Sequence, residues 1–261
     1  MRELGKLYPL LVILSLGAPR TSHAQVVCPA GATTRGVDVS QHQGSIDWSA
    51  VSASGIRFGI ARAVDGQLTD AKFKQNWDGI RAAGLVRGAY DFFEPQLSAA
   101  DQAATYLATV GSFGSGDLDP ILDVEVAGGQ SAFAVANGVA TWVSVVRAAT
   151  GRNPIVYTGA AFWNNFLGDP SSLGTDLWIA SWGRGCPNIP GAWANWTIWQ
   201  SSVSANVSGI AGAADLDQFN GSEAQLLAYA AVTDTPEPAS LALLGTGLLA
   251  VFGLRWRRRA A

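Results

Sequence analysis

Short apolar runs alternate with stretches of helical periodicity along the middle of the chain. A short apolar run is typical of a parallel strand that is buried on both faces. The strands predicted in this way are Val37–Ser40, Phe58–Ala63, Arg87–Phe92, Ile121–Val124, Ile155–Thr158, Leu177–Ser181 and Thr197–Gln200. The helices predicted between them are Ser49–Ser54, Ala71–Ala83, Ser98–Val110 and Phe133–Thr150. This alternation predicts an α/β fold with a mainly parallel sheet, either open or closed into a barrel.

The segment Ala71–Ala83 illustrates the helical pattern. Apolar residues that include Phe73 and Trp77 recur at helical spacing and form one face, and Gly84 follows as a stop signal. From Trp178 onward, the strands follow one another with little room for helices. We therefore expect an incomplete ring of helices around a flattened, irregular barrel.

Residues 1–24 have the layout of a secretory signal peptide. Two basic residues, Arg2 and Lys6, precede the apolar run Leu10–Leu16, and Ser22-His23-Ala24 supplies small residues at the cleavage positions. A buried core helix fits poorly, because Pro9 and other helix breakers flank or interrupt the segment. The chain is therefore expected to be exported.

The C-terminal end looks like a second targeting segment. Residues 233–238 form a linker that contains Pro236-Glu237-Pro238, and residues 239–261 combine an apolar run with a terminal arginine cluster. The run is near the lower length limit for a membrane helix, and the arginines favour the cytoplasmic side. The arrangement resembles the PEP-CTERM sorting signal of Gram-negative bacteria, which implies recognition and cleavage by an exosortase-type enzyme. A plain membrane anchor, with no processing, is the alternative.

The charge balance of the intervening region disfavours one class of partner. Of the 17 basic and 20 acidic residues in the sequence, 10 and 18 remain once residues 1–24 and 236–261 are set aside, so the net charge of the rest is −8. Nucleic-acid binding requires clustered Lys and Arg to neutralise phosphates, and no such cluster is present. About two hundred residues suffice for one domain with a sizeable core, which we place at residues 35–222.

The chain has only two cysteines, Cys28 and Cys186. In an exported protein they are a possible disulfide pair, although two free thiols remain an alternative because sequence does not give their distance. A structural zinc site is disfavoured, since one of the two histidines, His23, lies in the signal segment. We expect no metal and no cofactor.

The strongest chemical signal is the sequence Ile121-Leu122-Asp123-Val124-Glu125. Side chains alternate along a strand, so Asp123 and Glu125 are expected on the same side, where each raises the pKa of the other. In α/β barrels the carboxyl ends of the strands carry the chemistry. The alternative is that these residues are ordinary loop acids beside a strand.

The other strand ends supply further acids and aromatic residues. If they share one face, they form an acid-rich cleft with aromatic walls, in which rings pack against sugars and carboxyl groups protonate a glycosidic oxygen. The acids at these strand ends are Asp38, Asp47, Asp91, Glu94, Asp123, Glu125, Asp215 and Asp217. The expected substrate-binding residues are Tyr90, Tyr157, Trp178, Trp182, Trp199 and Gln200. Core packing is the alternative for several of the 10 tryptophans.

Seven segments in order resemble the glycoside hydrolase family 25 muramidases, the Chalaropsis-type lysozymes. They are Gly36-Val37-Asp38-Val39-Ser40 with Gln43-Gly44 and Ile46-Asp47-Trp48, then Asp70, Phe73 and Asn76, Gly88-Ala89-Tyr90-Asp91-Phe92, Leu122-Asp123-Val124-Glu125, Leu177-Trp178-Ile179-Ala180, Trp199-Gln200, and Asp215-Leu216-Asp217. The resemblance covers about residues 35–220 and implies an irregular, flattened β/α barrel. It also implies hydrolysis of the β-1,4 bond between N-acetylmuramic acid and N-acetylglucosamine in peptidoglycan.

The resemblance assigns roles to individual residues. Glu125 matches the general acid, and Asp38, Asp123 and Asp215 match the other cleft carboxylates; Tyr90 and Tyr157 match cleft aromatics. Asp123 or Asp215 would stabilise the positive charge that develops on the sugar or on its acetamido group. The choice between these two residues, and between a covalent nucleophile and acetamido participation, stays open.

Three acids depart from the family pattern. Asp91 and Glu94 stand where the family more often has His or a neutral residue, so we expect them to disfavour anionic muramyl groups or to shift the pH optimum. Asp217 stands where Asn is commoner. Two other functions remain open: a non-catalytic carbohydrate-binding surface protein, and a hydrolase of an amino-sugar exopolysaccharide. The expected location is the periplasm, cell surface or extracellular matrix, with transient or permanent anchoring in the inner membrane.

Overall fold

The computed structural model describes residues 24–231. The segments expected to be the signal peptide, the linker at 233–238 and the sorting tail at 239–261 therefore lie outside the described residues, apart from Ala24.

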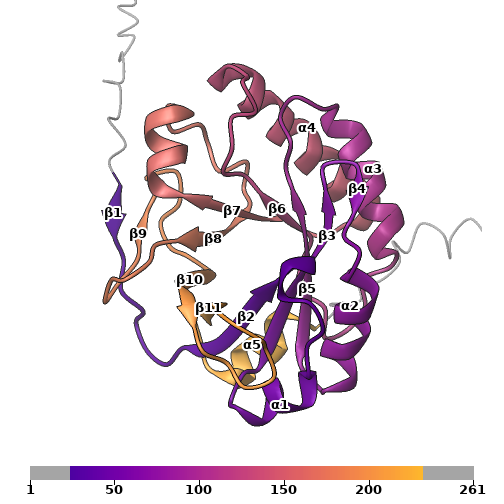
Figure 1. Cartoon of the computed structure of the whole chain (residues 1–261). Helices are drawn as coiled ribbons and strands as arrows, with labels where there is room; N and C mark the ends of the chain where they lie inside the picture. The colour runs from indigo at the N-terminus through magenta and orange to yellow at the C-terminus, as the bar shows by residue number, and fades with distance from the viewer. Residues whose placement is uncertain (1–23, 232–261) are drawn as a thin grey trace, which may run out of the picture.

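Eight strands of the described chain close into a barrel (Figure 1). In barrel order they are β2 (Thr34–Val39), β3 (Phe58–Asp65), β5 (Val86–Phe92), β6 (Ile121–Asp123), β7 (Ile155–Gly159), β8 (Asp176–Ala180), β10 (Ile198–Ala205) and β11 (Ala214–Phe219). Pairing of β2 with β3 closes the ring. Six of the eight junctions are parallel, whereas β11 runs antiparallel to both of its neighbours. The predicted α/β barrel is confirmed, and the sheet is closed.

Helices cover only part of the barrel. The long helices α2 (Phe73–Ala82), α3 (Ala99–Val110) and α4 (Ala132–Thr150) line one side, as Figure 1 shows. The side formed by β8, β10 and β11 has no helix between successive strands in the described chain; a short strand, β9 (Asn188–Ile189), lies there instead. This agrees with the expected incomplete ring. Of the remaining short elements, α1 (Trp48–Ala53) follows β2, and β4 (Leu68–Thr69) pairs with β3 at the rim.

The helices begin and end where side-chain chemistry predicts. Ser98 and Ser131 cap α3 and α4 by accepting hydrogen bonds from the backbone N–H groups of Asp101 and Ala134. At its other end α4 stops at Gly151, whose φ of 67° lies in the left-handed region. Among the described helices, α4 alone has the length and apolar composition of a membrane span. Here it packs on α3 and on the outer face of the barrel, so it belongs to the folded domain.

Two hydrophobic cores flank the barrel wall. The outer core fills the space between sheet and helices, and includes Trp142 of α4. The inner core fills the barrel with side chains such as Phe58, Ile60 and Ile155. Gly36 is required on the inner face of β2, because a Cβ there would overlap the ring of Phe58. The barrel is therefore a packed core and not a pore.

Two C-terminal elements were not predicted as such. β11 has an acid at alternate positions, so it lacks a continuous apolar run. The helix α5 (Glu223–Tyr229) lies beyond the expected domain boundary at residue 222. Its Leu226 and the following Ala230 join the inner core near the first residues of β3 and β5, so α5 closes the amino end of the parallel strands.

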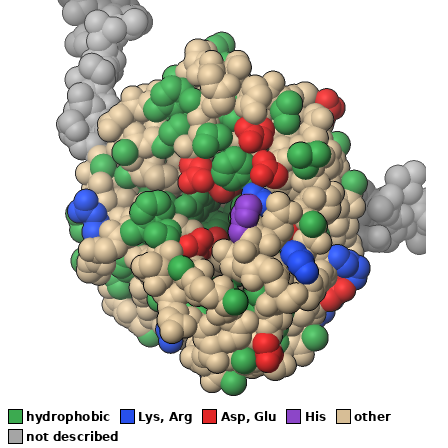
Figure 2. Space-filling model, viewed as in Figure 1, with side chains coloured by type: hydrophobic (Ala, Val, Ile, Leu, Met, Phe, Trp, Pro, Cys, Tyr) green, Lys and Arg blue, Asp and Glu red, His purple; other side chains and the backbone are tan. Residues whose placement is uncertain are grey.

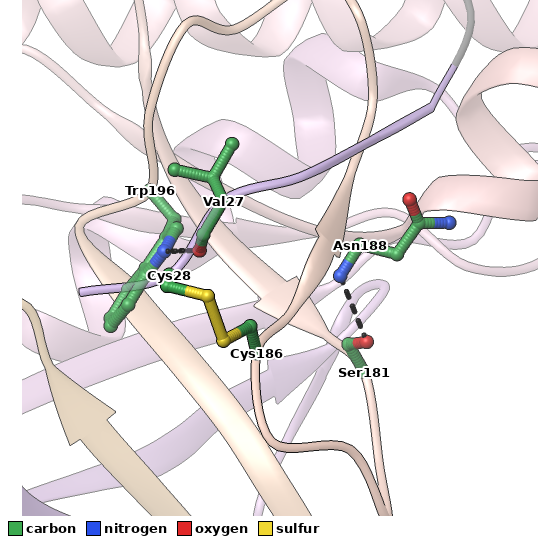
Figure 3. The surroundings of a disulfide bond; sticks show 6 residues. All are labelled: Val27, Cys28, Ser181, Cys186, Asn188 and Trp196. Carbon is green, nitrogen blue, oxygen red and sulfur yellow. Dashed lines mark hydrogen bonds between the residues drawn. A yellow bond between two sulfur atoms is a disulfide. The ribbon is translucent and has the colours of Figure 1, made fainter.

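The N-terminal segment is tied to the barrel by a disulfide (Figure 3). Cys28 bonds Cys186, and the strand β1 (Gln25–Val26) pairs antiparallel with β9. In the same region the indole N–H of Trp196 donates to the backbone oxygen of Val27, 2.8 Å away. Disulfide, strand pairing and hydrogen bond together fix residues 25–28 against the β8–β9 connection.

Candidate active site

A cleft of about 300 Å³ opens at the carboxyl ends of the parallel strands. Figure 2 shows acidic side chains gathered around this hollow. Its walls are formed by Asp38, Ser40, His42, Arg62, Tyr90, Phe92, Asp123, Glu125, Tyr157, Trp178, Trp182, Gln200, Val203 and Asp215. The structure thus brings together all four predicted cleft carboxylates and all but one of the predicted binding residues.

Asp38 and Asp215 face each other across two antiparallel strands. They are direct partners in the register of β2 and β11. Asp38 is buried, and its Oδ2 accepts a hydrogen bond of 2.8 Å from the Nε2 of Gln200. Burial, followed by the charge of Asp215, raises the pKa of Asp38 above its ordinary value. Asp215 is half-buried, and its pKa is raised by desolvation.

Asp123 and Glu125 occupy different depths of the cleft. Asp123 is the last residue of β6 and is buried, and its Oδ1 has no hydrogen-bond partner among the described residues. Burial raises the pKa of Asp123 well above its usual range, and the charges of Glu125 and Asp38 add to the effect. Glu125 lies past the strand end, exposed at the cleft mouth. Partial desolvation and then the Asp215 charge raise the pKa of Glu125.

Aromatic rings form the floor of the cleft. The ring of Trp178 packs edge-on against Tyr157, with centroids 4.6 Å apart, and against Tyr90 at 6.1 Å. All three side chains are nearly inaccessible to water. Trp182, in contrast, is 50% exposed at the rim and offers a free ring face. The cleft therefore has a buried aromatic base and an exposed aromatic edge.

Gln200 connects the acids to the aromatic residues. Its Oε1 accepts hydrogen bonds from the hydroxyl of Tyr157 at 2.9 Å and from the indole N–H of Trp182 at 2.8 Å. Its Nε2 donates to Asp38. Because every polar atom of the amide is used, Gln200 has one orientation, and it holds Asp38 and Trp182 in fixed positions.

Trp199 does not reach the cleft. It precedes Gln200 on β10, so strand alternation directs it to the outer face, where it packs on Trp196 in the outer core. Its indole N–H donates to the backbone oxygen of Ser181 at 2.7 Å. Its expected place in the substrate-binding set is therefore wrong.

The two extra acids near β5 also lie outside the cleft. Asp91 follows Tyr90 and faces outward, where it is fully buried and accepts a 2.8 Å hydrogen bond from the indole N–H of Trp142. Glu94 is partly exposed and pairs with Gln96. Neither lines the cleft, so direct contact with an anionic sugar there is not supported. The alternative, an effect on the pH optimum, stays a prediction, because the charge of Asp91 adds to the raised pKa of Asp123.

Sequence reasoning missed two basic side chains of the cleft, Arg62 and His42. Arg62 of β3 lines the wall and forms ion pairs of 3.0 Å with Asp65 and Asp70. Asp70 is a buried partner of this arginine. His42 also lines the cleft, in the short 3₁₀ turn after β2. The sequence offers little indication of either residue, because a single Arg in a strand or a single His in a turn is not part of a recognisable pattern.

The arrangement suits acid–base chemistry on a neutral, ring-containing substrate. Four carboxyl groups with raised pKa values share one cleft and differ in burial, an arrangement that favours a division into acid and base roles. Among residues 24–231 no group of three His, Cys, Asp or Glu side chains has a geometry that would hold a metal ion.

Comparison with known families gives two matches. The model for glycosyl hydrolases family 25 matches residues 37–210, and the PEP-CTERM protein-sorting motif matches residues 234–259. The first match contains three of the four cleft acids, and Asp215 lies just beyond it.

Individual relatives agree with the family match. Lysozyme M1 of Streptomyces globisporus is 35% identical over 208 residues, which cover 75% of this chain and 71% of that protein. A lysozyme structure from Streptomyces coelicolor aligns with a TM-score of 0.73 and 33% identity, covering 76% of this chain and 97% of that one. A family GH25 lysozyme from Aspergillus fumigatus gives 0.71 and 31%, covering 77% and 100%.

Proposed function

Because the chain belongs to glycosyl hydrolases family 25, whose lysozymes and muramidases are glycoside hydrolases, we propose that it cleaves peptidoglycan. The bond in question is the β-1,4 linkage from N-acetylmuramic acid to N-acetylglucosamine. The observation that carries the proposal is the meeting of Asp38, Asp123, Glu125 and Asp215 in one aromatic-walled cleft.

Glu125 acts as the general acid. It lies at the cleft mouth, where an incoming glycosidic oxygen has access to its carboxyl group. Its raised pKa increases the fraction that is protonated when substrate binds. On cleavage the proton moves from Glu125 to the leaving oxygen as the sugar–oxygen bond breaks. Water then adds its hydroxyl to the anomeric carbon of the sugar and returns a proton to Glu125, which completes the hydrolysis.

Asp123 and Asp215 complete the reaction centre. Both lie in the cleft with Glu125, and each is linked to it by an electrostatic interaction. Asp215 is the more accessible to water and therefore the better placed to remain an anion beside developing positive charge. Asp123 lines the cleft and is more deeply buried than Asp215, so we assign to it the orientation of an acetamido group of the sugar. Replacing each acid by Asn distinguishes the two roles. If Asp123 orients the acetamido group, Asp123→Asn should slow cleavage only of substrates that carry the N-acetyl group, whereas Asp215→Asn should slow cleavage with or without it.

The remaining cleft residues bind the sugar chain. Tyr90, Tyr157 and Trp178 form the floor, and Trp182 supplies an exposed ring on which a sugar face packs. Gln200 holds the side chains of Asp38 and Trp182 in place through hydrogen bonds. No cofactor or metal is needed for this chemistry.

The ends of the chain carry the proposed targeting. The match to the PEP-CTERM motif supports export in a Gram-negative bacterium and recognition by an exosortase-type enzyme. Residues 1–24 act as the signal peptide in this proposal, and residues 239–261 anchor the chain in the inner membrane before processing. The hydrolase domain then works in the periplasm, at the cell surface or in the extracellular matrix.

Product analysis tests the proposed bond. The mature chain, without its two targeting segments, is incubated with purified peptidoglycan, and the products are identified by mass spectrometry after reduction. We expect new reducing ends on N-acetylmuramic acid. Reducing ends on N-acetylglucosamine would assign a different bond and refute the muramidase proposal.

The PEP-CTERM match motivates one alternative substrate, an amino-sugar exopolysaccharide. The same digestion is run on that polymer in parallel. Cleavage of the exopolysaccharide alone would replace the proposed substrate. Tight binding to either polymer without new reducing ends would instead identify a non-catalytic carbohydrate-binding protein.

A further inference from the structure

Asp217 lies immediately below the cleft and is not part of its wall. It is completely buried, two residues after Asp215 on the same face of β11. Its register partner on β2 is Gly36, which lies two residues before Asp38. Because side chains alternate along strands, Asp217 forms the layer beneath Asp38 and Asp215.

The carboxyl group of Asp217 is only half satisfied. Its Oδ1 accepts a 2.9 Å hydrogen bond from the indole N–H of Trp178, on the cleft floor. Its Oδ2 is buried and has no donor among the described residues. An ionised carboxylate with an unpaired buried oxygen is costly, whereas a protonated one needs an acceptor. The neighbouring acid that can accept this proton is Asp38, which stands one layer above on the adjacent strand β2.

The surrounding charges oppose a second anion at this position. Asp38 and Asp215 are the acidic groups that act on Asp217. Trp178 and Gln200, from β8 and β10, are neutral. The other titratable or charged groups of the cleft are Tyr90 on β5, Asp123 and Glu125 after β6, Tyr157 on β7, Arg62 on β3, which is ion-paired, and His42 in the turn after β2. None of the cations is among the groups that act on Asp217.

One proton shared between Asp38 and Asp217 belongs on the deeper residue. Asp38 lines the cleft, keeps 5% of its surface accessible and accepts from Gln200, so its charged form is the better solvated. Asp217 has no accessible surface. A hydrogen bond from Asp217 lowers the pKa of Asp38, while the same bond raises the pKa of Asp217.

We propose that Asp217 is a positioning residue that stays protonated beneath the cleft and donates its proton in a hydrogen bond to Asp38. Asp38 thereby ionises more readily than its burial alone would allow, and it keeps its orientation toward the cleft. The Trp178 indole N–H occupies Oδ1 of Asp217, which leaves Oδ2 as the oxygen that carries the proton. The catalytic consequence rests on the proposed hydrolase function, but the protonation state does not.

Carboxyl titration by NMR tests the protonation state without any substrate. The ¹³Cγ signals of labelled aspartates are followed against pH in the wild type, and Asp217 is assigned by the signal lost in Asp217→Asn. We expect Asp217 to stay protonated at neutral pH. Titration at the value of an exposed aspartate, about pH 3.9, would overturn the proposal even in a fully active enzyme.

A matched pair of variants tests the positioning role. Asp217→Asn keeps an oxygen for Trp178 and a permanent N–H donor for Asp38, whereas the similarly sized Asp217→Leu has neither. We expect Asp217→Leu to raise the pKa of Asp38 and to move the acidic limb of the kcat/KM profile to higher pH. We also expect it to lower kcat by roughly tenfold, the effect of one lost charge-assisted hydrogen bond, with Asp217→Asn restoring both properties.

Two outcomes separate positioning from simple packing. Equal pH profiles for both variants would show that Asp217 only fills space, and would overturn the positioning role. If Asp217→Leu fails to fold, the pKa of Asp38 is compared between the wild type and Asp217→Asn. The proposal requires the same pKa in both proteins, and a changed value would overturn it. An inert wild type that still shows a protonated Asp217 would refute the hydrolase and leave the proton assignment standing.

Discussion

Single residues in the cleft differ mainly in how far they are removed from water, and this sets their protonation. Glu125 is the most accessible of the four acids that line the cleft, and Asp123 and Asp38 are buried. Burial is the first cause of the raised pKa in every one of them. The charge pattern of the cleft is thus a consequence of depth.

Removal of the Asp215 charge is expected to narrow the pH range of activity. Desolvation and the Asp215 charge both raise the pKa of Glu125, and Asp215→Asn leaves only desolvation. The general acid then loses its proton at lower pH, so the alkaline limb of the kcat profile moves to lower pH. A pH–rate profile of both proteins measures the shift, and an alkaline limb that stays in place would contradict the assignment of Glu125.

Asp91→Asn is expected to stabilise the protein without changing activity. Asp91 is fully buried outside the cleft, and burial raises its pKa well above the ordinary value. An acid with a raised folded-state pKa loses stability as pH rises from about 4 through that pKa, so its cost is greatest at alkaline pH. Asparagine retains the acceptor for Trp142 and removes the cost.

Urea unfolding at pH 4 and pH 8 measures this effect. We expect Asp91→Asn to gain about 1–2 kcal/mol over the wild type at pH 8 and to gain little at pH 4. An equal difference at both pH values would show that the carboxyl group is ionised in the folded protein.

The residues that sequence placed wrongly share one cause. The register of β10 decides that Gln200 faces the cleft and Trp199 faces away, and a Trp-Gln pair alone does not reveal which. Asp91 is misplaced for the same reason, because its neighbours Tyr90 and Phe92 take the cleft face of β5. Residue type indicated the chemistry of the cleft. Side chains alternate between the two faces of a strand, however, and only packing decides which set faces the cleft.

At the scale of elements, the β8–β9 connection carries the rim of the cleft. Trp182 stands at its start and Cys186 near its end, and the disulfide to Cys28 holds it to the N-terminal segment. The backbone N–H of Asn188 donates to the hydroxyl of Ser181, which closes the loop (Figure 3). The position of the exposed Trp182 therefore depends on residues far away in sequence.

Removal of this disulfide is expected to affect substrate binding more than the chemical step. In Cys28→Ser/Cys186→Ser the loop gains freedom, so KM should rise while kcat changes little. Stability should fall by about 2–4 kcal/mol, as for other long disulfide loops. Steady-state kinetics and thermal unfolding measure both effects. Trp182→Ala is the matched variant, because it removes the ring itself and should also raise KM. A wild-type KM in Cys28→Ser/Cys186→Ser would show that the disulfide does not position Trp182.

Element prediction succeeded where the apolar pattern was continuous. The four predicted helices and the seven predicted strands all occur with shifted ends. β11 was missed as a strand because its alternate positions carry Asp215, Asp217 and Phe219, a pattern set by the functional site and by the core together. The acids of the cleft thus interrupt the apolar pattern by which β11 would have been predicted as a strand.

At the scale of the whole molecule, the folded unit is larger than the family match. β1 precedes it and α5 follows it, and both contact the barrel. The backbone N–H of Gly116 donates to the oxygen of Ala230, and the Tyr229 hydroxyl donates to Asp176 at 2.6 Å. The helix α5 is therefore part of the folded domain.

Truncation after residue 222 is expected to destabilise the domain. It removes Leu226 and Ala230 from the inner core and exposes the amino end of the barrel. Loss of one buried leucine alone costs about 2–5 kcal/mol. Thermal unfolding of chains ending at 222 and 231 measures the difference. Equal midpoints would show that α5 contributes nothing to the fold.

The central claim is that Glu125 donates the proton that breaks the sugar chain. Initial rates of reducing-end release from purified peptidoglycan are compared for wild type, Glu125→Gln and Glu94→Gln, the last being a nearby glutamate outside the cleft. The account predicts a loss of roughly 10²–10⁴-fold in kcat for Glu125→Gln and a wild-type rate for Glu94→Gln. A Glu125→Gln enzyme that releases reducing ends at the wild-type rate would contradict it.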